Sequence, residues 1–307
     1  MQDGIDIRFI IGVAAILTAL VVLYFIILPP SIPRSDTRRE ASVDRPRVPE
    51  VGVLVSAQGK IEVQRSAESW TPLRVGEDVS FGDTLRTDAE GRASLRYGPG
   101  IALDVLPDTE LGVVRRGDAI RFLVSEGVAI ADVRPESEAK IQFTTPREDV
   151  IAETSQGTLG VLAQSDGTLQ AAAIRGETAV SAAGESRVVP EGYEVTIRPG
   201  QAPPVPTALP RSLLLKVRWP AAAPRERRQR VTGVTHPGAR VRVGESVVKA
   251  DEKGRFEAVV QLSEGGNTIG VIALDAAGRQ RSERAPPIEL DTRAPTATVE
   301  TDPTMWE

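Results

Sequence analysis

The sequence contains few side chains that could carry out acid–base or metal chemistry. Its 307 residues include no cysteine and a single histidine, His236. The missing thiols exclude disulfides, thiolate metal sites and cysteine nucleophiles, and one imidazole is fewer than most metal sites need. His236 precedes Pro237 and Gly238, which favour a turn, and we interpret it as a surface turn residue rather than as a catalytic base. We therefore predict no catalytic residue, no metal site and no cofactor.

Carboxylates are plentiful, and three places invite a chemical interpretation. Asp104 and Asp108 could be the paired acids of a glycan hydrolase, but such a site needs a cleft lined with large side chains, and only 4% of residues are aromatic. Asp83, followed by Thr87, is better explained by hydrogen bonds to the local backbone of a turn. Asp251–Gly254 could suggest calcium, but it lacks the alternating ligands and closing Glu of a loop site, which favours a plain hairpin.

A hydrophobic stretch near the N-terminus has the length of a membrane span. Phe9–Leu28 contains no charged residue, and a helix of about 20 residues matches the ~30 Å hydrocarbon core of a bilayer. Pro29 and Pro30 would end the helix because they lack a backbone N–H. A cleaved signal peptide would have a shorter apolar region followed by a small-residue cleavage site. We predict one uncleaved transmembrane helix over residues 9–28.

The charges on either side of this span conflict about its direction. Residues 1–8 contain one arginine, whereas five arginines lie between positions 34 and 47. The positive-inside rule would then keep the C-terminal part of the chain in the cytoplasm. An eight-residue tail is easily retained inside, however, and a long β region is typical of exported chains. We expect residues 1–8 to be a cytoplasmic tail and the bulk of the chain to be exported.

The chain beyond the span divides into a linker and a region of β pattern. Residues 29–50 are rich in Pro and Arg without apolar periodicity, and we predict an extended linker. From Val51, alternating apolar runs recur every 8–12 residues, as in a sandwich or barrel. Asp166-Gly167 predicts a type I′ hairpin, and Gly117-Asp118 a further turn of the same kind. The predicted strands are Val51–Ala57, Lys60–Arg65, Arg92–Tyr97, Ile101–Leu106, Glu110–Arg115, Ala119–Val124, Val128–Val133, Lys140–Thr144, Val150–Glu153, Gly157–Gln164, Leu169–Arg175, Thr178–Ala182, Ser186–Pro190 and Tyr193–Ile197.

A proline-rich stretch separates this region from a second β unit. Pro199–Pro210 holds five prolines in twelve residues, and we predict a linker over 199–230. Within it, Leu213–Val217 could form a strand, and Ala221–Arg230 is a charged link. A second β unit is predicted over 231–290. Its strands are Arg240–Val243, Ser246–Ala250, Phe256–Gln261, Asn267–Leu274 and Gln280–Ile288.

Short motifs run through residues 51–198 in a fixed order, each weak alone and specific as a set. They are Gly59–Val63, Trp70–Leu73, Val75–Glu77, Phe81–Thr87, Gly91–Leu95, Gly100–Leu103, Leu106–Leu111, Leu123–Val128, Phe143–Pro146, Gln156–Thr158 and Ile174–Val180. In this order they resemble the FecR domain of bacterial envelope proteins. The resemblance implies a β-rich periplasmic domain behind a single-pass inner-membrane helix. In some relatives, such a domain relays a signal from an outer-membrane transporter to a sigma factor.

The N-terminal side of the span departs from that signalling pattern. FecR-type relays carry a cytoplasmic anti-sigma segment of many tens of residues before the membrane helix, whereas this sequence has residues 1–8 there. We therefore do not expect direct control of a sigma factor. A transmembrane signal transducer that acts through a separate cytoplasmic partner remains the alternative function.

The second β unit also carries a recognisable set of motifs, followed by a tail. The unit resembles a bacterial immunoglobulin-like module, which implies a β-sandwich over 231–290. Residues 291–307 begin like the joint to a further such module, and they form either a closing strand with a loose end or a docking peptide. Trp306 is the candidate partner-binding residue of this tail. The motifs of the module are Gly233–Val241, Asp251–Phe256, Leu262–Ile269 and Ala273–Gly278.

Charge and composition favour a binding protein over an enzyme. The net charge of −5 leaves no basic footprint for nucleic acid. The leading hypothesis is a non-catalytic scaffold or adaptor, anchored in the membrane, whose β domains bind other envelope or inner-membrane proteins, or peptidoglycan. Such domains can bind by adding a strand at an exposed sheet edge. Self-association is left open.

Overall fold

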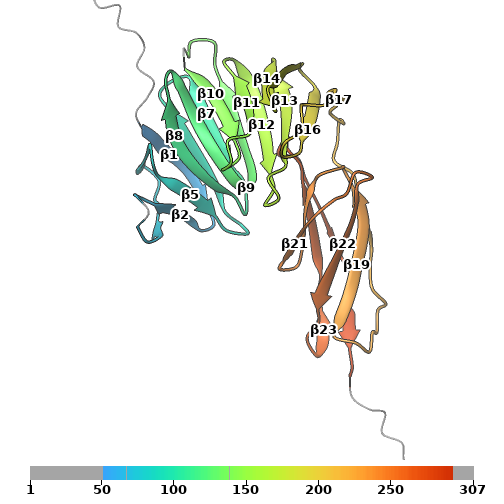
Figure 1. The fold of residues 1–307 in the computed structure, drawn as a ribbon. Coiled ribbons are helices and arrows are strands. Elements are labelled where there is room, and N and C mark those ends of the chain that lie inside the picture. Colours follow the sequence, from blue (N-terminus) through green and yellow to red (C-terminus); the bar gives the residue numbers. More distant parts are fainter. Residues whose placement is uncertain (1–50, 67, 138, 293–307) are drawn as a thin grey trace, which may run out of the picture. The chain divides into compact units, whose positions relative to one another are not determined.

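Every regular element that the structure describes is a β-strand (Figure 1). The computed structural model describes residues 51–292, except 67 and 138. Within that range the mainly β fold class is confirmed. None of these residues belongs to a helix that is long and apolar enough to cross a membrane. The predicted span, the linker behind it, most of the predicted tail and Trp306 lie outside the described residues.

The first region, residues 51–208, is built from strands β1 to β17. The short strands β3, β4, β5 and β17 were not predicted, because runs of two to four residues show too little apolar alternation. The strands are β1 (Val51–Gln58), β2 (Ile61–Gln64), β3 (Thr71–Pro72), β4 (Asp78–Ser80), β5 (Thr84–Thr87), β6 (Arg92–Tyr97), β7 (Ile101–Val105), β8 (Glu110–Arg116), β9 (Ala119–Val133), β10 (Lys140–Thr144), β11 (Val150–Thr154), β12 (Gly157–Ala163), β13 (Leu169–Arg175), β14 (Thr178–Ala182), β15 (Glu185–Val189), β16 (Tyr193–Ile197) and β17 (Thr207–Ala208).

Two sheets share the long strand β9. One sheet has the order β4-β1-β6-β7-β9-β12-β13-β16-β17. The other has the order β3-β2-β5-β8-β9-β10-β11-β14-β15. The pairing of β9 with β10 is parallel, and the other pairings of these two sheets are antiparallel. Figure 1 shows β9 running from one sheet into the other.

A glycine explains why β9 was not predicted as one strand. The prediction of two strands, Ala119–Val124 and Val128–Val133, is wrong, because residues 119–133 are continuous. Gly127 has a φ of 106°, which lets the chain bend between the sheets without ending the strand. A Cβ atom at Gly127 would lie 2.5 Å from the Cα of Thr109, so a larger residue would also clash.

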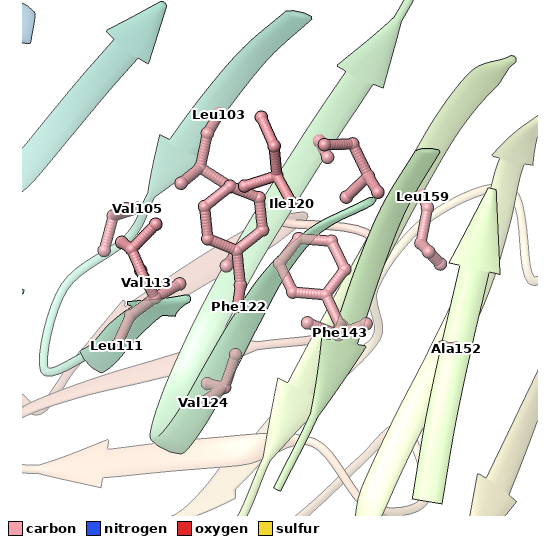
Figure 2. Close-up of a cluster of buried hydrophobic side chains, with 14 of the residues drawn as sticks. Leu103, Val105, Leu111, Val113, Ile120, Phe122, Val124, Phe143, Ala152 and Leu159 are labelled. Atoms are coloured by element: carbon pink, nitrogen blue, oxygen red, sulfur yellow. The ribbon is translucent and has the colours of Figure 1, made fainter. Parts of the chain in front are cut away.

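The core between these sheets consists mainly of aliphatic side chains with a small aromatic group (Figure 2). The rings of Phe122 and Phe143 lie side by side on β9 and β10, with centroids 5.3 Å apart. Tyr97 contacts Phe122 edge-on at 5.6 Å. Burial, with the charge of Asp83 second, raises the pKa of Tyr97, whose hydroxyl has no hydrogen-bond partner among the described residues. Buried residues alternate with partly exposed ones along β9 and β10. This period of two residues is the pattern from which the strands were predicted.

The second region contains two sheets and a short strand pair around its own core. The sheets have the orders β18-β19-β22 and β21-β20-β24-β25, and β23 pairs with β26. Buried Val, Leu, Ile and Phe side chains fill the space between the sheets. The strands are β18 (Leu215–Arg218), β19 (Arg228–Thr235), β20 (Arg240–Val243), β21 (Ser246–Lys249), β22 (Arg255–Gln261), β23 (Gly265–Asn267), β24 (Gly270–Leu274), β25 (Gln280–Arg284) and β26 (Ile288–Leu290).

Several predicted boundaries differ in this region. The segment 199–230, predicted as a linker, holds β17, β18 and the start of β19. Leu213 and Leu215 are buried in the same core as Val231, so ordered packing begins before position 231. The predicted strand Gln280–Ile288 is interrupted, because the Pro-Pro pair between β25 and β26 offers no backbone N–H to a ladder. The predicted strand Asn267–Leu274 is likewise split into the end of β23 and β24.

Candidate interaction surface

The three-stranded sheet of the second region has an outer face rich in cations. Strand pairing places Lys216 beside Val234 and Val234 beside Arg255, and one row further Arg218 beside Thr232 and Thr232 beside Glu257. Half of the ten outward positions are Lys or Arg, and one is Glu. We call these ten side chains the cationic face. They are Lys216, Arg218, Arg228, Arg230, Thr232, Val234, Arg255, Glu257, Val259 and Gln261.

Two of the five cations on this face have acid partners. Arg230 pairs with Glu257 at 3.2 Å, and Arg255 pairs with Asp251 at 2.8 Å. Hydrogen bonds led by the backbone N–H of Arg255 lower the pKa of Asp251 and keep it ionised. The remaining three cations have no ion-pair partner among the described residues, and all are exposed. They are Lys216, Arg218 and Arg228.

The cationic face is concave near β18 and includes apolar surface. A depression of about 650 Å³ is lined by side chains of β18, β19 and β22, including Lys216, Arg218 and Glu257. Exposed Val234 lines it, and exposed Leu214 comes directly before β18 in the chain. Gly233 contributes no side chain, since a Cβ there would lie 2.4 Å from both the Phe256 ring and the Lys216 carbonyl oxygen. The face therefore combines unpaired positive charge with accessible apolar atoms.

Strand β18 also leaves one backbone edge unpaired. It pairs with β19 on one side, and no described strand pairs with its other side. Side chains of the edge strands of the other sheet reach the first region, through Lys249 of β21 to Asp166 and Gln280 of β25 to Arg92. Edge strand β15 is approached by the proline-rich segment, where Arg187 donates to the Pro203 carbonyl at 3.0 Å. Strand β25 lies near β18 but does not pair with it. The edge of β18 thus combines backbone groups that no described strand pairs with, and cations without an ion-pair partner.

A second group of cations lies where the two β regions meet, and these cations are paired. We call this contact the junction. Arg240 pairs with Glu126 at 2.8 Å, and Arg242 contacts the Asp108 carboxylate. Burial lowers the pKa of Arg240, and the charge of Glu126 opposes this effect.

Small residues and apolar side chains complete the junction. Leu274 and Ala276 of the second region pack with Val128 and Leu162 of the first region in one buried cluster. Gly160 permits the close approach, because a Cβ there would lie 2.1 Å from the Ala276 carbonyl oxygen. The junction is therefore a packed contact as well as an electrostatic one.

His236 lies in this junction, which corrects its predicted place on the surface. It does occupy the predicted turn, but its Nε2 contacts the carboxylate of Glu194, which is only 3% exposed. Gln170 donates to the other oxygen of Glu194 at 3.2 Å, and its own Oε1 has no partner among the described residues. A buried acid needs such partners. The pair could not be predicted from the sequence, because Glu194 lies in β16, 42 residues before the histidine, and only the fold brings the two together.

A groove beside the junction carries both signs of charge. It has a volume of about 560 Å³ and is lined by Arg86, Arg147 and Arg240 together with Asp108, Glu110, Glu126 and polar side chains. Because acids and bases balance along it, the groove favours no charge class of ligand. In the part of the chain that the structure describes, no group of three or more His, Asp or Glu is placed to hold a metal ion.

The predicted carboxylates are held by separate partners. Asp83 accepts the backbone N–H of Ser80 at 2.8 Å, which confirms its role in a local turn. Thr87 instead bonds distant backbone, donating to Leu106 O at 2.7 Å. Asp104 accepts a hydrogen bond from Ser94 Oγ at 2.6 Å, whereas the carboxylate of Asp108 contacts Arg242. The structure therefore engages Asp104 and Asp108 in unrelated contacts.

The predicted turns are present, but neither hairpin turn is of the predicted type I′, because Asp118, like Asp166, does not have positive φ. Asp251 Oδ1 accepts the backbone N–H groups of Lys253 and Arg255, both at 2.8 Å, so the predicted hairpin is confirmed. The hairpin at Asp166-Gly167 also forms, but only Gly167 has positive φ, so it is not a type I′ turn. Asp166 Oδ1 instead accepts the N–H of Thr168 at 2.8 Å, which stabilises a longer loop.

Comparison with known proteins adds little to this geometry. No family model matches the chain, and no curated protein matches it. One matching solved structure is a protein provisionally named an anti-sigma factor, from Parabacteroides distasonis ATCC 8503. It has 10% sequence identity and a TM-score of 0.35, and the alignment covers 41% of this chain and 59% of that chain. A match at this TM-score supports no conclusion about function.

Proposed function

We propose that this chain is a non-catalytic scaffold or adaptor of the bacterial envelope. In this proposal, residues 9–28 hold it in the inner membrane, and its β regions lie in the periplasm, where they bind other envelope proteins. The FecR-like and immunoglobulin-like motifs of the sequence support the envelope setting. The proposal assigns the protein no catalytic activity and no cofactor.

One observation carries the binding role: the unpaired cations of the cationic face. Elsewhere in the described structure, partly buried cations such as Arg240 and Arg121 have acid partners. Lys216, Arg218 and Arg228 have none, although the chain as a whole is acidic with a net charge of −5. Clustered charge of one sign on a surface attracts partners of the opposite sign and speeds their association.

The alternative is a transmembrane signal transducer that works through a separate cytoplasmic partner. It rests on the FecR resemblance alone, and no side-chain arrangement in the described regions favours it over a scaffold. Both proposals require a periplasmic partner, so the first experiment addresses that partner.

In-cell crosslinking tests the binding role directly. A photo-crosslinking residue placed at Lys216 should yield adducts with a discrete envelope protein. The matched control places the same residue at Arg115, an exposed arginine of the first region. Adducts to peptidoglycan would redirect the proposal toward cell-wall binding. Equal or absent adducts at both positions would contradict a binding role for the cationic face.

A further inference from the structure

The cationic face and the free edge of β18 together indicate the kind of partner that fits. Resting on the proposed binding function, we infer that an acidic, extended segment of a partner protein adds as a fourth strand along β18. The backbone edge supplies the hydrogen bonds, and Lys216 and Arg218 select the charge. Strand addition uses main-chain bonds for affinity and alternate side chains for specificity.

The spacing of the cations defines the segment that they would accept. Lys216 and Arg218 lie two positions apart on the same outward side of β18. In a strand such residues are separated by about 6.6 Å. Side chains directly opposite on an added strand lie within contact distance, and opposite charges there stabilise the pairing. The segment should therefore carry Asp or Glu at alternate positions.

The other side of β18 defines the remaining positions of the segment. Leu215 is buried, and Val217 and Trp219 are half-buried against the core of the second region. Side chains of the added strand that point the same way would extend this apolar surface. The expected pattern is thus acidic and apolar residues in alternation.

The same cations argue against pairing between two copies of this chain. Charged side chains on an edge strand prevent edge-to-edge association, because like charges would meet across the new pairing. A second β18 would bring Lys216 and Arg218 against their own copies. An acidic segment would not meet this repulsion. The charges of β18 therefore disfavour pairing with a second copy of β18 and favour pairing with an acidic strand.

A membrane or a glycan fits the geometry less well. Either could meet the positive charge, but neither presents N–H and C=O groups at the regular spacing of a strand, which is the spacing of the β18 edge. Only a polypeptide strand satisfies both the charge and the backbone hydrogen-bonding groups of this site.

A designed peptide tests the inference on the full chain in a neutral detergent. The probe is a labelled peptide of alternating Glu and Val, and its binding is measured by fluorescence anisotropy. We expect saturable binding that weakens with added salt. The double variant Lys216→Glu with Arg218→Glu should lower the affinity about tenfold or more, from two lost charge pairs and new repulsion.

The matched control variant changes the net charge by the same amount elsewhere. It combines Arg115→Glu with Arg134→Glu, two exposed arginines of the first region. Its affinity for the peptide should stay within about twofold of wild type. An equal loss in both variants would mean non-specific attraction and would overturn the inference.

Backbone methylation separates strand addition from simple charge attraction. Peptides N-methylated at alternate positions lose the N–H groups of one edge only. Methylation of the edge that faces β18 should abolish binding, and methylation of the opposite edge should not. Equal affinities for the two peptides would reject strand addition, while in-cell adducts at position 216 would still support the proposed binding function. Absence of those adducts would reject the function itself.

Discussion

The cations of the junction and those of the cationic face differ in what surrounds them. At the junction, Arg240 has an acid partner and a side chain that is only 12% exposed. On the cationic face, Lys216 and Arg218 are exposed and have no acid partner among the described residues. Buried charges require partners, whereas exposed ones do not. The first group therefore holds this chain together, and the second is available to another molecule.

The two places also contain the same five-residue turn in two environments. Asp251–Arg255 beside the cationic face and Asp275–Arg279 at the junction both follow the pattern Asp-x-x-Gly-Arg. In each, one carboxylate oxygen accepts the backbone N–H two and four residues ahead, and the other accepts the arginine Nε. The two turns therefore make the same hydrogen bonds and differ in how deeply their Asp and Arg side chains are buried.

The largest predicted effect uses this pair of turns. Asp275 is fully buried, and Asp275→Ala would leave the half-buried Arg279 guanidinium without its partner. We expect a loss of about 3 kcal/mol or more in the free energy of unfolding, measured by denaturant titration. Asp251→Ala removes the same bonds from an exposed turn and should cost much less. Equal losses would mean that turn geometry, and not burial, sets the contribution.

The next effect concerns charge reversal at the two surfaces. Arg240→Glu would place two acids together at the junction and should cost about 1 to 2 kcal/mol of stability. Lys216→Glu on the exposed edge should stay within about 0.5 kcal/mol of wild type. The double variant Arg240→Glu with Glu126→Arg should recover part of the loss. Failure of this rescue would argue that packing around Arg240, and not its ion pair, stabilises the junction.

The sequence predicted the elements of the fold better than their contacts. Period-2 alternation located most strands, because it reports which side of each strand is buried. It failed at Gly127, where a residue that usually ends a strand instead bends one. It also failed at Glu194 and His236, because a polar pair formed by a strand residue and a distant turn residue leaves no periodic signal.

The candidate surface was only partly visible in the sequence. The sequence of Ala221–Arg230 shows its charge but predicts a linker. Its last residues instead begin β19, and the alternation that points Arg228 and Arg230 outward is set by pairing with β22. The register between strands is a tertiary property. A single sequence therefore shows the charge but not the surface that it forms.

The smallest predicted effect is the response of one junction pair to acid. Burial opposes ionisation of Asp166, but hydrogen bonds from Thr168 and Lys249 outweigh it and lower its pKa. A lowered folded pKa adds stability above the unfolded value of about 3.9, and this is lost as the pH falls through the folded value. Because the pair is exposed, Asp166→Asn should reduce the pH-dependent loss of the free energy of unfolding by only a few tenths of a kcal/mol. Unfolding measured from pH 2 to 6 would show it, and an unchanged acid limb would contradict this assignment.

Hydrogen exchange of the backbone amides tests the central claim about β18 most directly. With the alternating acidic peptide bound to the full chain, amides in Leu215–Arg218 should exchange more slowly, because their free edge becomes paired. The other edge strands, β15 and β25, should exchange as before. Slower exchange confined to β18, and lost in the Lys216→Glu, Arg218→Glu variant, is the result that we predict. Protection at β15 or β25 instead, or none in β18 while the peptide is bound, would contradict it.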